Sequence, residues 1–139
     1  MIVLDTNVLS ELMKATPSEA VSSWVARQPP SSLFITTVAQ AEILNGLALL
    51  PSGSRRDKLR AAAQAMFEED FAGRILPFDI AAAYQFAEIA AERRQSGRPI
   101  SQFDAQIAAI ARSRGAALST RNISDFEGCG LQIFNPWNL

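Results

Sequence analysis

Hydrophobic and polar positions alternate along this chain in a way that predicts short apolar strands separated by helices. Strands rich in Ile, Leu, Val and Phe are expected at 2–4, 33–36, 74–78, 116–120 and 131–134. Residues with helical spacing lie between them, at about 17–28, 38–50, 55–70, 80–97 and 102–115. Because strands that alternate with helices pair side by side in one direction, the pattern predicts an α/β fold with a parallel sheet.

Capping signals support several of these helix boundaries. Thr16 followed by Glu19, and Thr37 followed by Gln40, have the spacing of capping boxes. Asp79 is a candidate cap for the helix after it. The helix at 38–50 is apolar on nearly every side, so we expect it to be largely buried.

Length and composition predict a single domain spanning residues 1–139. No apolar run approaches the roughly 18 residues that a membrane span requires. The first residues lack the basic segment and apolar stretch of a signal peptide. The single cysteine, Cys129, excludes an internal disulfide. We therefore expect a cytoplasmic protein.

The absence of histidine narrows the possible chemistry. It excludes a Ser-His-Asp triad, histidine-based acid–base hydrolysis and any histidine-ligated zinc site. A hydrolase of this composition would have to use carboxylates, together with a hard cation that prefers oxygen ligands. The net charge is −1, and the 13 basic residues comprise 11 arginines and two lysines, clustered at 54–60, 92–98 and 112–114. These clusters are either solvated helix faces or phosphate contacts.

Three acidic residues are expected at the same edge of the sheet. Asp5 ends the first strand, Glu42 lies one turn into an apolar helix, and Asp104 lies on the inward-facing stripe of its helix. Each could be a turn or cap residue, and Ser101 to Asp104 has capping-box spacing. Ligands of open α/β sheets, however, bind beyond the carboxyl ends of the strands. The loop after 116–120 adds Asn122 and Asp125 to this edge, so the arrangement favours a shared acidic site.

Such a site needs a positive partner. Two carboxylates about 5 Å apart repel by about 3 kcal/mol at an effective dielectric constant of about 20. Protons, a cationic group or a metal ion would relieve that repulsion. Mg²⁺ or Mn²⁺ suits the oxygen donors and can assist phosphodiester hydrolysis.

Four segments together resemble the PIN-domain family, and within it the VapC-type toxins. They are "LDTN", the acid in the second buried helix, "RPISQFDAQIAAIARSRG" and "STRNISDFEG". "GRILPFD" and "FNPWNL" are similar to the FitB branch of that group. The resemblance extends over essentially the whole chain. It implies a three-layer α/β/α fold with a parallel sheet in the strand order 3-2-1-4-5.

The resemblance also implies a function. It indicates the toxin of a type II toxin–antitoxin system, an endoribonuclease that uses Mg²⁺ or Mn²⁺ held by Asp5, Glu42 and Asp104. Thr120 and Asn122 would complete the hydrogen-bonding shell. Many members carry Asp where Asn122 stands, so Asp125 is the alternative source of a fourth carboxylate.

The implied partners are a cognate antitoxin, an RNA substrate, and a second copy of the chain in a homodimer or a toxin–antitoxin hetero-oligomer, with no membrane association. The competing hypothesis is a non-catalytic, FitB-like protein that acts with its antitoxin in DNA binding. Leu59, Met66 and Phe67 either form a docking surface or contact the core. Four arginines are expected to border the acidic pocket and steer RNA, namely Arg93, Arg94, Arg98 and Arg121.

Overall fold

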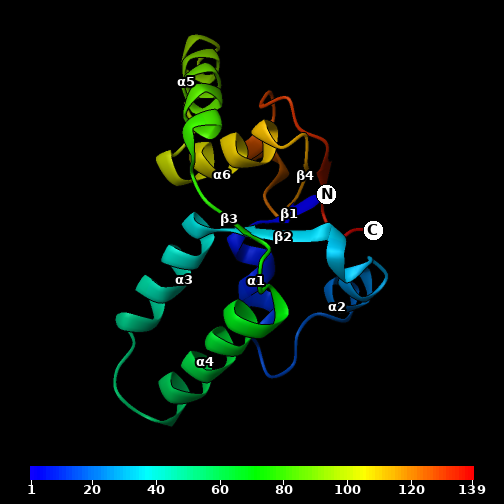
Figure 1. The fold of residues 1–139 in the computed structure, drawn as a ribbon, viewed down its shortest axis with the longest axis vertical. Helices are drawn as coiled ribbons and strands as arrows, with labels where there is room; N and C mark the ends of the chain where they lie inside the picture. The colour runs from blue at the N-terminus through cyan, green and yellow to red at the C-terminus, as the bar shows by residue number, and fades with distance from the viewer.

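The computed structural model describes residues 1–139 and contains one five-stranded parallel sheet. The strand order is β3-β2-β1-β4-β5, as the family resemblance implied. Figure 1 shows the sheet in the middle of the molecule, between two groups of helices. The strands are β1 (Ile2–Leu4), β2 (Leu33–Thr36), β3 (Ile75–Leu76), β4 (Ala117–Ser119) and β5 (Ile133–Phe134).

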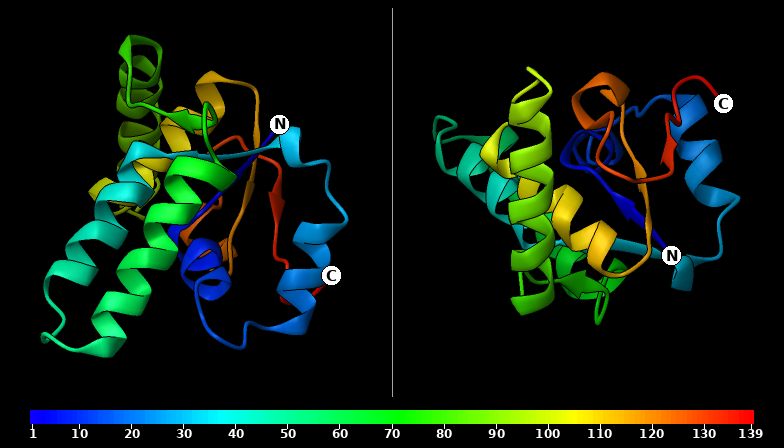
Figure 2. Two further views of the ribbon diagram at one scale, coloured as in Figure 1. Left: turned by 60° about the horizontal axis from the view of Figure 1, so that its bottom comes forward. Right: turned by 90° about the horizontal axis from the view of Figure 1, so that it is seen from above.

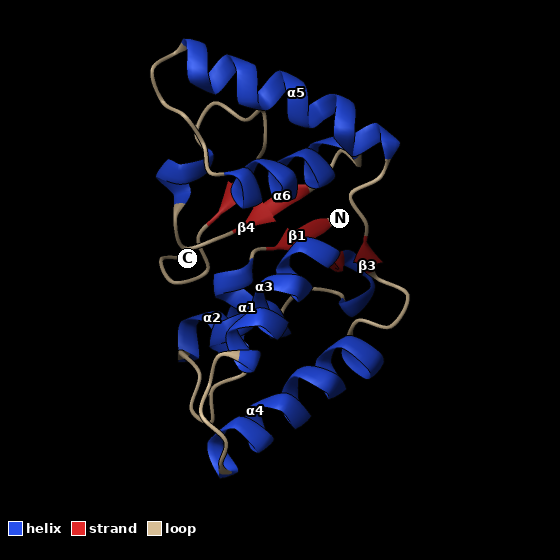
Figure 3. Ribbon diagram, turned by 90° about the vertical axis from the view of Figure 1, so that its left-hand side faces the viewer, coloured by secondary structure: helices blue, strands red, loops and turns tan.

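Helices cover both faces of the sheet and complete the predicted three-layer α/β/α architecture. Figure 3 shows α5 and α6 on one side of the strands and α1 to α4 on the other, and the two views in Figure 2 agree. Three single turns, at Pro30–Ser32, Met66–Asp70 and Ile123–Phe126, link these elements. None of the helices combines the length and hydrophobicity needed to span a bilayer. The helices are α1 (Thr6–Leu12), α2 (Glu19–Ala26), α3 (Thr37–Ala48), α4 (Ser54–Ala65), α5 (Ile80–Gln95) and α6 (Gln102–Ser113).

The hydrophobic core is divided by the sheet into two clusters. Val3 packs with Ile89 of α5 and Ile107 of α6, whereas Leu4 packs with Leu9 of α1 on the opposite face. All five of these side chains are completely buried. Neighbouring residues of a strand point to opposite faces, so β1 alone anchors both helical layers. The residues directly after β1 are therefore held in a rigid position.

The strand order reverses at β1, which has β2 on one side and β4 on the other. Leu4 is paired with Ser119 of β4, and the backbone N–H of Asp5 donates to the Ser119 carbonyl at 2.9 Å. Asp5 and Thr120 therefore leave the sheet side by side. This is the position at which ligands bind in open α/β sheets.

Several helix starts differ from their predicted positions. Asp5 caps α1, a helix that the hydrophobic pattern did not predict, by accepting from the Thr6 N–H at 2.8 Å. The second helix begins after Ser18 rather than after Thr16. Thr36, not Thr37, caps α3, because its hydroxyl accepts from the Ala39 N–H at 3.0 Å. The caps predicted at Asp79 and Ser101 are confirmed.

The burial of two helices also differs from expectation. Leu44 and Leu49, on and just after α3, are 50% and 77% exposed, so the helix predicted to be buried is half solvent-facing. Only one stripe of α3 packs against the core. In and after α4, by contrast, Met66 and Phe67 are buried in the core, and Leu59 packs against it. Those three residues are core contacts.

Candidate active site

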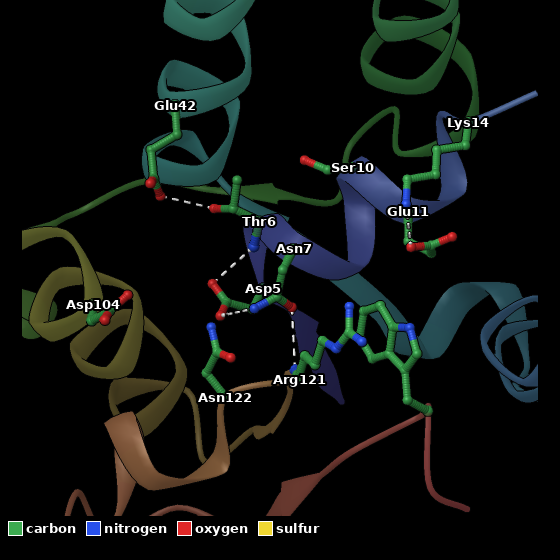
Figure 4. Close-up of a pocket in the computed structure, with 11 residues that line it drawn as sticks. Asp5, Thr6, Asn7, Ser10, Glu11, Lys14, Glu42, Asp104, Arg121 and Asn122 are labelled. Atoms are coloured by element: carbon green, nitrogen blue, oxygen red, sulfur yellow. Dashed lines mark hydrogen bonds and ion pairs between the residues drawn. The ribbon is translucent and has the colours of Figure 1, made fainter. Parts of the chain in front are cut away.

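A polar pocket of about 430 Å³ opens at the carboxyl ends of β1 and β4. Its walls come from α1, α3, α6 and the loop after β4 (Figure 4). Four acidic and two basic residues line it, and Trp137 is its single hydrophobic residue. The lining residues are Asp5, Thr6, Asn7, Ser10, Glu11, Lys14, Glu42, Asp104, Arg121, Asn122 and Trp137.

Asp5 lies at the bottom of the pocket and is held on both carboxylate oxygens. Oδ1 accepts from the Thr6 backbone N–H at 2.8 Å. Oδ2 accepts from the Thr120 hydroxyl at 2.8 Å and from the Asn7 side-chain amide at 3.3 Å. Only 5% of Asp5 is exposed. The carboxylate is therefore fixed in one orientation, with uncharged donors around it.

Burial raises the pKa of Asp5 from 3.8 to about 6. The hydrogen bonds from Thr120 and Thr6 oppose that shift, whereas the negative charges of Asp104 and Glu42 add to it. Burial likewise raises the pKa of Asp104, and the charge of Asp125 contributes to the increase. A carboxylate buried without a cation favours its protonated form. Only the Ser101 hydrogen bond and the charge of Arg93 oppose the increase at Asp104, and no cation is paired with either carboxylate.

Glu42 and Asp104 approach the same pocket from different helices. Glu42 Oε1 accepts from the Thr6 hydroxyl at 2.8 Å, which links α3 to the start of α1. Asp104 lies in the first turn of α6, where its backbone N–H is capped by the Ser101 hydroxyl at 3.2 Å. Ser101 is the one side chain hydrogen-bonded to Asp104 and opposes the rise in its pKa, so the carboxylate is left available to a ligand. We define Asp5, Glu42 and Asp104 as the acidic half of the pocket.

The three other predicted site residues take different positions. Thr120 is completely buried below the pocket, where it donates to Asp5 and accepts from the Asn122 backbone N–H at 3.1 Å. Asn122 itself lines the pocket, and Figure 4 shows it beside Asp5. Asp125 is outside the lining, and acts on the site only through its charge on Asp104. The side chain that faces the pocket from this loop is therefore Asn122.

The other end of the pocket contains Arg121 and three residues to which the sequence analysis gave no role. Glu11 accepts from Lys14 Nζ at 2.9 Å and from the Ser18 backbone N–H at 2.9 Å. The bond from Lys14 is the main reason that the pKa of Glu11 is lowered, and the charge of Arg121 adds to the effect. We call Glu11, Lys14, Arg121 and Trp137 the compensated half. The polar stripe Asn7, Glu11 and Lys14, spaced by four and three residues, was the available signal for α1.

Only one of the four arginines expected at the pocket lines it. Arg121 does so, whereas Arg93 is buried and donates to the carbonyl oxygens of Arg98, Asp125 and Glu127. Arg98 is paired with Glu127 at 2.9 Å. Arg93 and Arg98 thus secure the loop after β4 against the end of α5. The prediction that Arg93, Arg94 and Arg98 border the pocket is therefore wrong, because none of them lines it. Arg93 acts on the pocket through its charge, which opposes the raised pKa of Asp104.

The donor chemistry of the acidic half suits a hard divalent cation. Every side chain there presents oxygen, histidine is absent from the chain, and the one cysteine is buried elsewhere in the core. Oxygen-only donor sets favour Mg²⁺ or Mn²⁺ over zinc or copper. In the structure these carboxylates do not converge on one point, and no three acidic side chains are arranged as a metal site. The acidic half therefore suits a divalent cation by its negative charge and by its oxygen donors.

Comparison with known proteins is decisive about the family. The PIN domain family matches residues 2–127. The chain belongs to the PIN-domain family. Its relatives include the VapC ribonuclease Y4jK of Sinorhizobium fredii, which is 42% identical over 99% of this chain and 98% of its own length. Toxin FitB of Neisseria gonorrhoeae is 34% identical over 99% of each chain.

Solved structures agree with this assignment. The structure of FitAB bound to an IR36 DNA fragment matches this PIN domain with a TM-score of 0.93 and 34% identity, over 100% of this chain and 97% of the other. The chain is thus homologous to VapC-type and FitB-type toxins over nearly its whole length. The resemblance drawn from four short segments is confirmed.

Proposed function

We propose that this PIN-domain protein is the toxin of a type II toxin–antitoxin system and an endoribonuclease that depends on Mg²⁺ or Mn²⁺. The observation that carries the proposal is the acidic half, where three carboxylates face one pocket and no cation is paired with any of them. The ribonuclease relative at 42% identity supports the same activity.

Asp5, Glu42 and Asp104 would hold the metal ion, and when bound it would polarise the scissile phosphodiester and activate water. Thr120 and Asn7 fix the Asp5 carboxylate, so that its oxygens are oriented before any ligand arrives. Thr6 does the same for Glu42. Asn122 supplies an uncharged amide at the position beside Asp5, where it can donate to a phosphate oxygen.

An active ribonuclease must be restrained in its own cell, and we propose a cognate antitoxin as the partner. The support is that the relative Toxin FitB corresponds to the matched FitAB structure, and that another matched structure is VapBC-5 of Mycobacterium tuberculosis, a member of the VapBC family of toxin–antitoxin systems. A hetero-oligomer of toxin and antitoxin, with toxin–toxin contacts inside it, follows from that analogy. Co-expression with the neighbouring gene product and size measurement of the purified complex tests this partner.

The direct test of the activity uses the purified, antitoxin-free protein and a mixed RNA pool. We expect cleavage with Mn²⁺ or Mg²⁺ and none with EDTA. Asp5→Asn should abolish cleavage, because it removes the buried charge while keeping the shape. Asp57→Asn, which changes an exposed carboxylate on α4, is the matched control and should cleave like wild type. Equal cleavage by Asp5→Asn and wild type would overturn the proposal.

A second candidate function is regulation of DNA by a toxin–antitoxin complex without catalysis. Two observations favour it: Asn122 stands where many family members carry an acid, and the FitAB relative is bound to DNA. On this hypothesis the complex binds its promoter fragment, and the free protein leaves RNA intact at every metal concentration. The cleavage assay therefore separates the two functions.

A further inference from the structure

Arg121 and Trp137 form a pair at the edge of the pocket. The guanidinium carbon of Arg121 lies 5.0 Å from the centroid of the Trp137 ring, and both residues line the pocket. The four ion pairs of the structure all involve other residues. Arg121 is exposed, and its guanidinium lies over an aromatic ring rather than beside a carboxylate. An arginine held in this way is preorganised to bind an anion.

The backbone holds this pair in place. The Trp137 N–H donates to Asn135 Oδ1 at 3.0 Å, and the Asn138 N–H donates to the Asn135 carbonyl at 3.1 Å, which closes a turn. Asn135 Nδ2 in turn donates to the Arg121 carbonyl at 3.5 Å. The Arg121 N–H donates to Asn7 Oδ1 at 3.2 Å, next to Asp5. The pair is thus tied to the acidic half by hydrogen bonds between backbone groups and the side chains of Asn7 and Asn135.

Trp137 is also unusual in its surroundings. It is the only hydrophobic residue in a lining of eleven, and it is half-buried, with part of the ring against the core. Packing against the hydrophobic core alone does not explain why part of the Trp137 ring lines a polar pocket. An aromatic face next to a free arginine is instead the arrangement that takes a nucleobase and its phosphate in single-stranded nucleic-acid sites.

We propose that Trp137 and Arg121 form a nucleotide subsite, in which Arg121 moves off the Trp137 ring to bind a phosphate beside the scissile one, and an unpaired base of the RNA stacks on the ring face that this uncovers. This inference rests on the proposed ribonuclease function. The base must be unpaired, because a base inside a duplex has both faces covered by its neighbours. Arg121 draws the backbone to a site whose carboxylates would otherwise repel it.

The binding test uses the fluorescence of Trp137. The chain has two tryptophans, and Trp24 is only 5% exposed, so a quencher in the pocket acts on Trp137. We would titrate the protein, without divalent metal, with a six-nucleotide 2′-O-methyl RNA that cannot be cleaved. The same strand in a duplex and a strand with abasic positions serve as the comparison ligands. We expect the single strand to quench, and the other two to bind about tenfold more weakly.

Substitutions separate stacking from charge. Because Trp137→Ala and Trp137→Phe remove the fluorophore, their binding and that of wild type are compared by the anisotropy of a fluorescently labelled single strand. Trp137→Ala should weaken binding about tenfold, and Trp137→Phe, which keeps a ring, by about threefold or less. Arg121→Gln should reduce the slope of log K against log salt by about 0.7, the value for one phosphate contact on a single strand. Arg94→Gln is the matched control, because Arg94 is exposed at the end of α5 and lies outside the pocket. Equal melting temperatures would show that each variant is folded.

Three outcomes would overturn the subsite. One is equal binding of abasic and normal strands by a wild type that still cleaves RNA, which leaves the proposed function intact. The second is unchanged affinity in both Trp137→Ala and Trp137→Phe. The third is quenching by an antitoxin peptide and not by RNA, which would assign the pair to the protein partner. Failure of the wild type both to bind and to cleave RNA would instead defeat the proposed function itself.

Discussion

The two halves of the pocket treat their carboxylates in opposite ways. In the compensated half, Glu11 is bonded to Lys14 and to the Ser18 N–H, and its pKa is lowered. In the acidic half, Asp5 is equally hidden from solvent but has only neutral donors, and its pKa is raised to about 6. The difference shows that burial alone does not define a functional acid. The compensated carboxylate stabilises the fold, whereas the uncompensated one stores repulsion that a ligand can release.

The same contrast distinguishes the arginines. Arg93 is buried and uses its donors on backbone carbonyls of the loop after β4. Arg121, on that same loop, pairs with no carboxylate and lies against Trp137. One arginine therefore holds the loop in position and the other is free to act on a ligand. Substitutions of the acidic-half carboxylates and of Glu11 should accordingly differ, and most strongly in catalysis.

Among the carboxylates of the pocket, only those of the acidic half should be needed for catalysis. We expect Asp104→Asn and Glu42→Gln each to reduce the rate of RNA cleavage about 10³-fold, equivalent to about 4 kcal/mol of transition-state stabilisation. Glu11→Gln should stay within about threefold of wild type, because Lys14 already neutralises that carboxylate. Initial cleavage rates at saturating Mn²⁺ measure both. A loss in Glu11→Gln as large as in Asp104→Asn would erase the distinction between the halves.

Asp5 and Glu11 should contribute to the pH dependence of protein stability with opposite signs. The folded pKa of Asp5 lies above its ordinary value of 3.8, at about 6, so the folded state binds more protons in that interval. The stability from protonated Asp5 is present below about pH 4 and is lost as pH rises through about 6, a change of about 3 kcal/mol. Glu11 has a lowered pKa, so its contribution is instead lost as pH falls.

Denaturant unfolding of metal-free protein at several pH values checks these signs. Asp5→Asn should remove the decline in unfolding free energy between about pH 4 and pH 6. Glu11→Gln should keep that decline and be less stable than wild type near neutral pH, because the Ser18 N–H loses a charged acceptor. A wild-type stability that rises from pH 4 to pH 6 in step with Asp5→Asn would contradict the assignment for Asp5.

A divalent metal should stabilise wild type by relieving the repulsion in the acidic half. At a concentration about 100 times its dissociation constant, a ligand that binds only the folded state adds about 2.7 kcal/mol. In a domain of this size that corresponds to a rise in Tm of roughly 5–10 °C. Mn²⁺ at pH 7.5 should produce this shift in wild type and in Glu11→Gln, and much less in Asp5→Asn. Thermal melts with Mn²⁺ and with EDTA provide the measurement.

The acidic half could be predicted from the sequence better than the compensated half, and the reason is physical. Asp5, Glu42 and Asp104 each lie at or near a boundary of a predicted element, and parallel strands bring such positions to one edge. The strand order itself came from family resemblance, since alternation of strands and helices permits several orders. The helix α1 was missed because Asp5 to Asn7 is equally compatible with a turn.

The remaining differences arise from contacts between distant segments. Nothing in residues 92–98 indicates that Arg93 turns inward to a distant loop, as its bonds to Asp125 and Glu127 require. Trp137 reaches the pocket only because β5 runs beside β4 and the turn at Asn135 bends the chain back. Local patterns describe elements well, but these side-chain positions depend on tertiary packing.

A more modest change is expected at the residue that departs from the family pattern. Asn122→Asp would place a fourth carboxylate in the acidic part of the pocket lining, beside Asp5. The added negative charge beside Asp5, partly screened by solvent in the open pocket, should lower the free energy of unfolding of the metal-free protein by about 1 kcal/mol at pH 7.5. Mn²⁺ should then raise Tm by more than it does in wild type, because the metal neutralises one more charge.

Asp125→Asn is the comparison that makes the Asn122→Asp result informative. Asp125 is exposed and outside the pocket lining, although its charge contributes to the raised pKa of Asp104. Removing that charge should lower the pKa of Asp104 slightly and leave the Mn²⁺ response close to that of wild type. If Asp125→Asn instead abolishes the Mn²⁺ shift while Asn122→Asp leaves it unchanged, Asp125 supplies the fourth position of the site. The fourth residue of the acidic half would then be Asp125 and not Asn122.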